Sequence, residues 1–136
     1  MKIRVEYRKF DLSVGSNDYF KEIFNFDCTG NLDKIDYPLY FELLLEHEND
    51  FKTVFVEMAK LTYEKAKLKV LITYPEKPKH IEYLVGNFSN IIKQSNSTFK
   101  ENQETEYLLI YGMLNESKVD WHFNSFDING FKKELC

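Results

Sequence analysis

The chain has 136 residues, 43% of them hydrophobic, and a formal net charge of −4, which fits one globular domain that buries a core without disulfides or a structural metal. This acidic balance argues against a protein that binds nucleic acid non-specifically through a basic surface, although an enzyme that contacts nucleic acid through Mg²⁺ can be acidic overall. No apolar run approaches the ~20 residues that span a bilayer, no signal-peptide core is present, and Cys28 and Cys136 form no CxxC pair, so we expect a cytoplasmic protein without membrane contact or a zinc signature.

The amino-terminal part of the chain predicts a strand, a helix and two further strand-like segments. Residues 2–10 alternate apolar and charged side chains, which is typical of a half-buried strand. Apolar residues at helical spacing predict a short helix over 17–26. Residues 32–48 are strand-like with a break at Pro38, and the stretch 39–46 is apolar enough to indicate a central strand buried on both faces.

The middle of the chain predicts two helices around a buried strand. Apolar residues recur every three to four positions over 51–67 and predict a helix, which is followed by a buried strand over 68–74. A strand, a helix and a strand within ~35 residues indicate a right-handed crossover between parallel strands. A second helix is predicted over 78–94, and a polar loop over 94–105.

The carboxy-terminal part predicts a β-hairpin. Residues 107–114 and 119–126 are strand-like and are joined by a short polar turn, with Trp121 expected in the hairpin core. No repeat, low-complexity tract or linker divides the chain, so we expect a single α/β domain over residues 1–136.

An acidic group at the end of the central strand is the stretch most suited to chemistry. On a regular strand Glu46 and Glu48 share one face with their backbones ~7 Å apart, so both carboxylates can approach one cation. Asp36, from the preceding strand, would supply a third oxygen ligand, and such ligands suit Mg²⁺ or Mn²⁺. Clustered carboxylates repel one another unless a cation neutralises them. Lys60, one turn after Glu57 on the following helix, is a candidate for that role.

The order of these elements and acids resembles the PD-(D/E)xK nuclease superfamily over roughly half the chain. Asp36 matches the metal-binding Asp of that family, and Glu46 matches its (D/E) position. Glu48 stands where the family has Lys, and Lys60 on the next helix would take over the role of that Lys. The Pro-Asp pair itself is absent, because Pro38 follows the acid instead of preceding it. The resemblance implies a restriction-endonuclease-like fold, a mixed β-sheet flanked by helices.

The same resemblance implies a divergent metal-dependent nuclease. Asp36, Glu46 and Glu48 would hold the metal, Glu57 would bind a second metal or position Lys60, and Lys60 would orient the attacking hydroxide. The metal would lower the pKa of a bound water and polarise the scissile phosphate. The expected partners are nucleic acid and either a second copy or a larger protein. The alternatives are a non-catalytic binding or assembly protein on the same scaffold, and an unrelated small α/β interaction protein.

Ordinary structural roles compete with each of these assignments. Four charged residues at helical spacing are typical of a solvated, salt-bridged helix face: Glu57, Lys60, Glu64 and Lys67. Asn49 or Asp50 could be the N-cap of the helix and have no functional role. His47 faces away from Glu46 on a regular strand, so we expect a packed or surface histidine there, not a ligand.

Basic residues around the strand at 68–74 are candidates for a phosphate-contacting rim, although surface lysines are common on any protein. They are Lys65, Lys67, Lys69, Lys77, Lys79 and His80.

Overall fold

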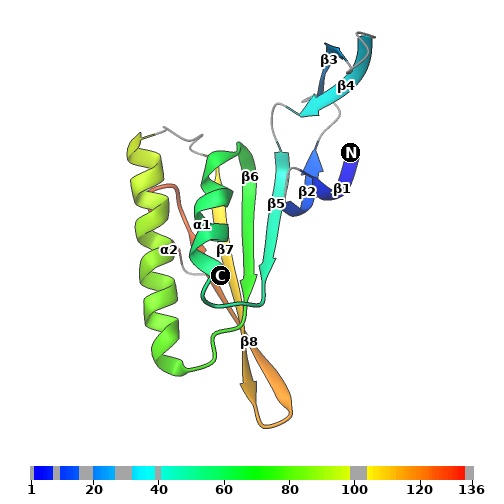
Figure 1. The fold of residues 1–136 in the computed structure, drawn as a ribbon. Helices are drawn as coiled ribbons and strands as arrows, with labels where there is room; N and C mark the ends of the chain where they lie inside the picture. The colour runs from blue at the N-terminus through cyan, green and yellow to red at the C-terminus, as the bar shows by residue number, and fades with distance from the viewer. Residues whose placement is uncertain are drawn as a thin grey trace.

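The computed structural model describes residues 2–7, 10–15, 20–26, 32–38, 41–98 and 104–133, and before residue 41 it describes the backbone alone. The described part is a mixed α/β fold in which a seven-stranded sheet carries two helices, α1 (Val54–Tyr63) and α2 (Pro78–Thr98) (Figure 1). The strands of this sheet, in spatial order, are β1 (Lys2–Tyr7), β2 (Phe10–Gly15), β5 (Phe41–Glu48), β6 (Ala66–Thr73), β7 (Glu106–Asn115), β8 (Lys118–Phe126) and β9 (Lys132–Lys133). A separate two-stranded ribbon pairs β3 (Phe20–Phe26) with β4 (Leu32–Pro38).

The centre of the sheet is parallel and its flanks are antiparallel. β5 pairs with β6 and β6 with β7 in parallel, whereas β1, β2 and β5 form an antiparallel meander and β7 pairs antiparallel with β8. Parallel neighbours require a crossover, and α1 and α2 supply the two crossovers. The predicted strand–helix–strand unit is therefore confirmed, and the carboxyl ends of β5, β6 and β7 meet at one edge of the sheet.

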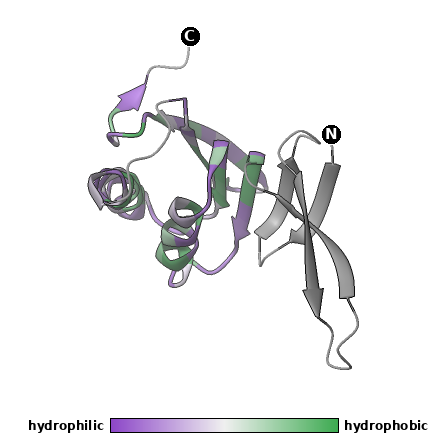
Figure 2. Cartoon of the chain, turned by 90° about the horizontal axis from the view of Figure 1, so that it is seen from above, coloured by the Kyte–Doolittle hydropathy of each residue, from purple (hydrophilic) through white to green (hydrophobic). Residues whose placement is uncertain are grey.

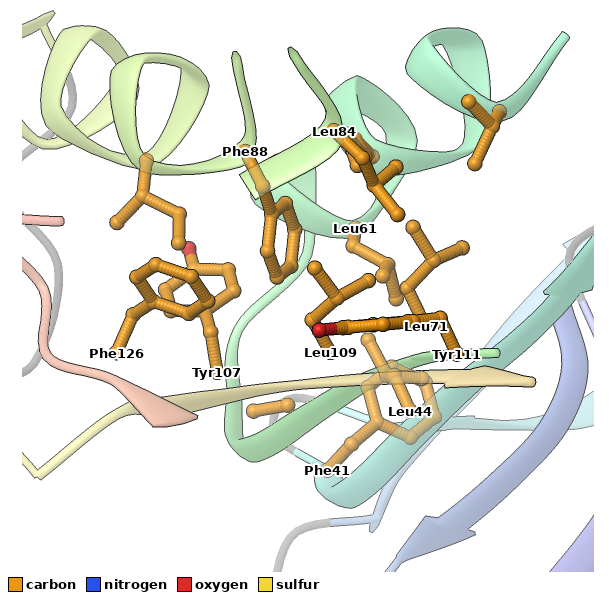
Figure 3. Close-up of a cluster of buried hydrophobic side chains, with 14 residues drawn as sticks. Phe41, Leu44, Leu61, Leu71, Leu84, Phe88, Tyr107, Leu109, Tyr111 and Phe126 are labelled. Atoms are coloured by element: carbon orange, nitrogen blue, oxygen red, sulfur yellow. The ribbon is translucent and has the colours of Figure 1, made fainter. Parts of the chain in front are cut away.

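Both helices pack on the same face of the sheet (Figure 2). α1 buries Val54, Met58 and Leu61, which recur at helical spacing, and α2 buries a second apolar stripe in the same way. These side chains meet those of the strands in one core (Figure 3), and removing each buried Leu or Phe from water contributes ~1.5–3 kcal/mol. The strand residues of this core are Phe41, Leu44, Ala66, Leu71, Tyr107, Leu109, Tyr111 and Phe126.

The prediction of a helix over 17–26 is wrong, because these residues contain the strand β3. Its backbone pairs with β4 over its whole length, from Phe20 opposite Pro38 to Phe26 opposite Leu32. Aromatic and β-branched residues favour a paired strand, and this pairing prevails over the local helical spacing.

The helix boundaries also differ from those predicted. α1 begins only at Val54, and its N-cap is Thr53, whose side chain makes no capping hydrogen bond. Neither Asn49 nor Asp50 is therefore the N-cap. α2 continues to Thr98, so the predicted polar loop is helical at its start, and residues 99–103 lie outside the described part.

The predicted hairpin of β7 and β8 is confirmed, but the expectation for Trp121 is wrong. Asn115 and Lys118 are partners on either side of a two-residue turn. Trp121 is opposite Gly112 on the sheet face that carries no helix, and 47% of it is exposed. Within the described residues, neither helix has the length and apolar composition to cross a membrane.

Candidate functional site

Glu46 is a buried carboxylate near the carboxyl end of β5. It shares the helix-covered face with Leu44 because side chains alternate along the strand, and it is only 2% exposed. Its partner on β6 is Leu71, which belongs to the hydrophobic core. A carboxylate among such neighbours remains charged only if a cation or hydrogen-bond donors compensate the loss of water.

Lys60 provides that cation from α1. Its Nζ lies 2.6 Å from Oε1 of Glu46 and 2.5 Å from Oε2 of Glu57, one helical turn earlier. The three side chains therefore form a carboxylate–ammonium–carboxylate group, called the acidic cluster below. The prediction that Lys60 neutralises Glu46 is confirmed, whereas the alternative of a purely solvated helix face does not account for a buried Glu46.

The electrostatics of the cluster keep Lys60 charged. Burial alone would lower the pKa of Lys60, but hydrogen bonds and charge interactions with Glu46 and then Glu57 outweigh it and hold the pKa above the ordinary value of 10.5. Lys60 is therefore an ammonium at neutral pH. It can stabilise negative charge, but it cannot accept a proton.

A buried hydroxyl lies on β6, opposite Glu48. Thr73 of β6 is fully buried, and its Oγ1 makes no hydrogen bond to any residue in the described part of the chain. Its partner across the strands is Glu48, whose Oε1 accepts a hydrogen bond of 2.8 Å from the backbone N–H of Asp50. Buried polar atoms are normally paired, so the Thr73 hydroxyl keeps an unused capacity for a hydrogen bond.

The structure does not place Asp36 on a strand that adjoins β5. Asp36 belongs to β4, where its partner is Glu22 on β3, and this ribbon is separate from the seven-stranded sheet. Figure 1 shows the ribbon near the amino end of β5, whereas Glu46 lies near the carboxyl end of that strand. The side chain of Asp36 lies outside the described part.

A different acid, Asp11, occupies the strand that does adjoin β5. β2 pairs antiparallel with β5 through Leu12 opposite Leu45, and the same register continued by one residue places Asp11 opposite Glu46. The alternation predicts a strand over residues 2–10 only, and no local pattern revealed β2 or its pairing with β5.

The residues expected around the site divide between the two faces of the sheet. His47 is exposed on the face opposite Glu46, as predicted, and its Nε2 lies 3.0 Å from the hydroxyl of Tyr74. The predicted basic rim is wrong for Lys69, which is fully buried with its Nζ 3.1 Å from the hydroxyl of Tyr107.

The acidic cluster supplies few of the donors that a divalent cation needs. Glu46 and Glu57 present hard oxygen atoms, which Mg²⁺ prefers, but both carboxylates are paired with one ammonium. Within the described residues, no group of three or more His, Cys, Asp and Glu side chains could hold a metal ion. A complete ligand set would therefore need a donor from outside them.

Comparisons with protein-family models, curated proteins and solved structures give no match to this chain.

Proposed function

We propose that the chain is a divergent metal-dependent nuclease that hydrolyses phosphodiester bonds of nucleic acid at the acidic cluster. The observation that carries this proposal is the almost completely buried Glu46, joined through Lys60 to Glu57 at the carboxyl ends of parallel strands. Ligands of open α/β sheets bind at this edge. The resemblance of the motif to the PD-(D/E)xK superfamily supports the same reaction, with a restriction-endonuclease-like fold.

In this proposal Glu46 and Glu57 would hold Mg²⁺ or Mn²⁺ together with an acid from another strand, and the backbone-bonded Glu48 would border the site. The bound metal would lower the pKa of a water and polarise the scissile phosphate. Lys60 remains charged, so it would stabilise the negative charge that develops on the phosphate and would not act as the base. Burial of Glu46 keeps its carboxylate in one orientation and excludes bulk water from its side of the site.

The test measures Mn²⁺ binding and cleavage together on the full chain. We expect Mn²⁺ to raise the melting temperature and to support cleavage of single-stranded DNA, duplex DNA or RNA. Glu46→Gln should abolish both effects while the protein stays folded. Glu42→Gln is the matched control, because Glu42 is on the same strand and face and is also held by a lysine, Lys67, at 3.0 Å.

A second pair of variants identifies the acid that completes the site. Asp11→Asn should remove the Mn²⁺-dependent rise in melting temperature, whereas Asp36→Asn should leave it unchanged, because β2 and not β4 pairs with β5. The nuclease proposal is wrong if none of the three substrates is cleaved with Mn²⁺ or Mg²⁺ and the metal does not change the melting temperature of the wild type.

One observation favours a second candidate, a non-catalytic binding or assembly protein. Lys60 already pairs with both carboxylates of the acidic cluster, so the cluster has a structural role without any metal. In that case Glu46→Gln changes the stability equally with and without Mn²⁺, and no cleavage occurs in either protein.

A further inference from the structure

β8 has a free outer edge over most of its length. Its outer neighbour in the sheet, β9, pairs only with Ser125 and Phe126. No other strand among the described residues lies along β8 on that side, and every side chain from Lys118 to Phe123 is exposed. Figure 1 shows this part of the hairpin projecting beyond the helices. Such an edge presents unpaired N–H and C=O groups that can form a ladder with another strand.

The hairpin register shows which backbone groups point outward. Asn115 and Lys118 flank a two-residue turn, and in such a turn the first C=O accepts a hydrogen bond from the N–H of the last residue. The backbone groups of Lys118 therefore point toward β7, and alternation along an antiparallel strand directs those of Val119, Trp121 and Phe123 toward the free edge.

The same three residues expose their side chains on the sheet face that carries no helix. Val119 is 40% exposed, Trp121 47% and Phe123 52%, and no charged side chain of β8 lies between them on this face. Asp120 and His122 alternate with them and project to the other face. A strand with outward backbone groups and an apolar face suits a second strand of the same character.

We propose that this edge pairs with the same edge of a second copy, antiparallel and centred on Trp121, so that the two sheets become continuous. In this register Trp121 is opposite its counterpart, Val119 is opposite Phe123 of the second copy, and the residues with outward backbone groups pair with one another. Asp120 is opposite His122 of the second copy, so an acceptor is opposite a ring that can donate a hydrogen bond. Cross-strand pairs of this kind stabilise a sheet.

The neighbouring registers are less favourable. A shift that centres the pairing on Asp120 places two carboxylates opposite each other, which is destabilising. A shift that centres it on His122 places Val119 opposite Ser125, which already pairs with β9. With Trp121 at the centre, the ladder runs from Lys118 to Asn124. The turn of the second copy then lies beside Ser125, the first residue along β8 that pairs with β9.

A second copy is the partner that this surface fits best, because a two-fold axis through Trp121 makes the edge complementary to itself. Such an isologous contact closes after two subunits and occupies the β8 edge of each copy. Nucleic acid is a poor occupant, since the residues on this face are apolar and the chain carries a net charge of −4. The inference does not depend on the proposed nuclease activity.

The test is sedimentation velocity of the full chain over a dilution series, with Phe123→Lys as the disrupting variant. We expect a reversible dimer in the wild type. The dissociation constant of the dimer should be at least ~30-fold higher in the variant, because an edge lysine in a partly buried contact opposes pairing. Phe131→Lys makes the same chemical change at a residue that is 68% exposed but lies outside β8, and it should dimerise like the wild type.

Two further measurements check the register itself. Trp121 is the only tryptophan, so its fluorescence should shift to shorter wavelength as the protein concentration rises. His122→Asp should weaken the dimer by placing two acids opposite each other, and addition of Asp120→Lys should restore it. The proposal is overturned if the wild type is a monomer at every concentration, or if Phe123→Lys dimerises as well as Phe131→Lys.

Discussion

The two faces of the central sheet follow opposite rules of burial. On the face covered by α1 and α2, the charged side chain of Glu46 is 2% exposed among fully buried leucines. On the other face, Trp121 and Phe123 are about half exposed although both are large aromatic side chains. A buried charge and an exposed aromatic side chain both cost free energy in isolation. Lys60 compensates the charge on the first face, and the exposed aromatic side chains on the second face are the basis of the proposed dimer.

The largest expected contrast between the faces comes from neighbouring residues of β6. Leu71→Ala removes a fully buried core side chain and should lower the free energy of unfolding by about 3 kcal/mol. Ile72→Ala, on the opposite face and only partly buried, should cost about 1 kcal/mol. Urea unfolding of both variants measures the contrast, and equal losses would show that the second face is covered as well as the first.

Removal of the cation from the acidic cluster should have the next largest effect. Lys60→Met leaves Glu46 buried without its ammonium and should cost about 2 kcal/mol at neutral pH. Part of this loss should be recovered by Mn²⁺ if the two carboxylates bind metal. Lys67→Met, which breaks the more exposed pair with Glu42, should cost less than about 1 kcal/mol. Urea unfolding with and without Mn²⁺ measures these differences, and equal costs for the two lysines would contradict the special role of the cluster.

A smaller effect on stability is expected from substitution of Gly112, which is on the sheet face that carries no helix. A Cβ at this position would lie 2.6 Å from Cγ1 of Val119 and 3.1 Å from the ring of Tyr74. Gly112→Ala should therefore displace these side chains and lower the free energy of unfolding by about 1–2 kcal/mol. Thermal unfolding measures the loss, and the Trp121 fluorescence should change with it because the Tyr74 and Trp121 rings are in contact. An unchanged melting temperature would show that β8 shifts to make room.

The smallest effect is a pH dependence confined to the alkaline range. The pKa of Lys60 is raised in the folded state, so its contribution to stability is present below the unfolded value of 10.5 and is lost as the pH rises through the higher folded value. The difference in unfolding free energy between the wild type and Lys60→Met should stay constant near neutral pH. It should shrink only above pH 10.5. A difference that already falls between pH 7 and 9 would contradict the raised pKa.

Local sequence patterns predicted the elements whose burial has one clear period. β5, α1 and the hairpin of β7 and β8 were each predicted as the correct kind of element, although α1 is shorter than predicted, because each pattern reflects burial within a single element. The segment Phe20–Phe26 was wrongly predicted as a helix, because its residues fit both a helical and a strand pattern. Only the pairing with β4 selects the strand. The pairing of Glu46 with Lys60 was predictable in the same way, from one strand and the helix that follows it.

Local patterns did not predict which strands from distant parts of the chain pair with one another. β2 and not β4 adjoins β5, so Asp36 is not on the strand next to Glu46. Nor could the sequence show that both helices pack on one face and leave Trp121 exposed on the other. Side-chain periodicity records whether a residue is buried but not against which strand, because many pairings bury the same apolar area. The acidic residues could therefore be identified from the sequence, whereas the strands next to them and the free edge of β8 depend on long-range strand pairing.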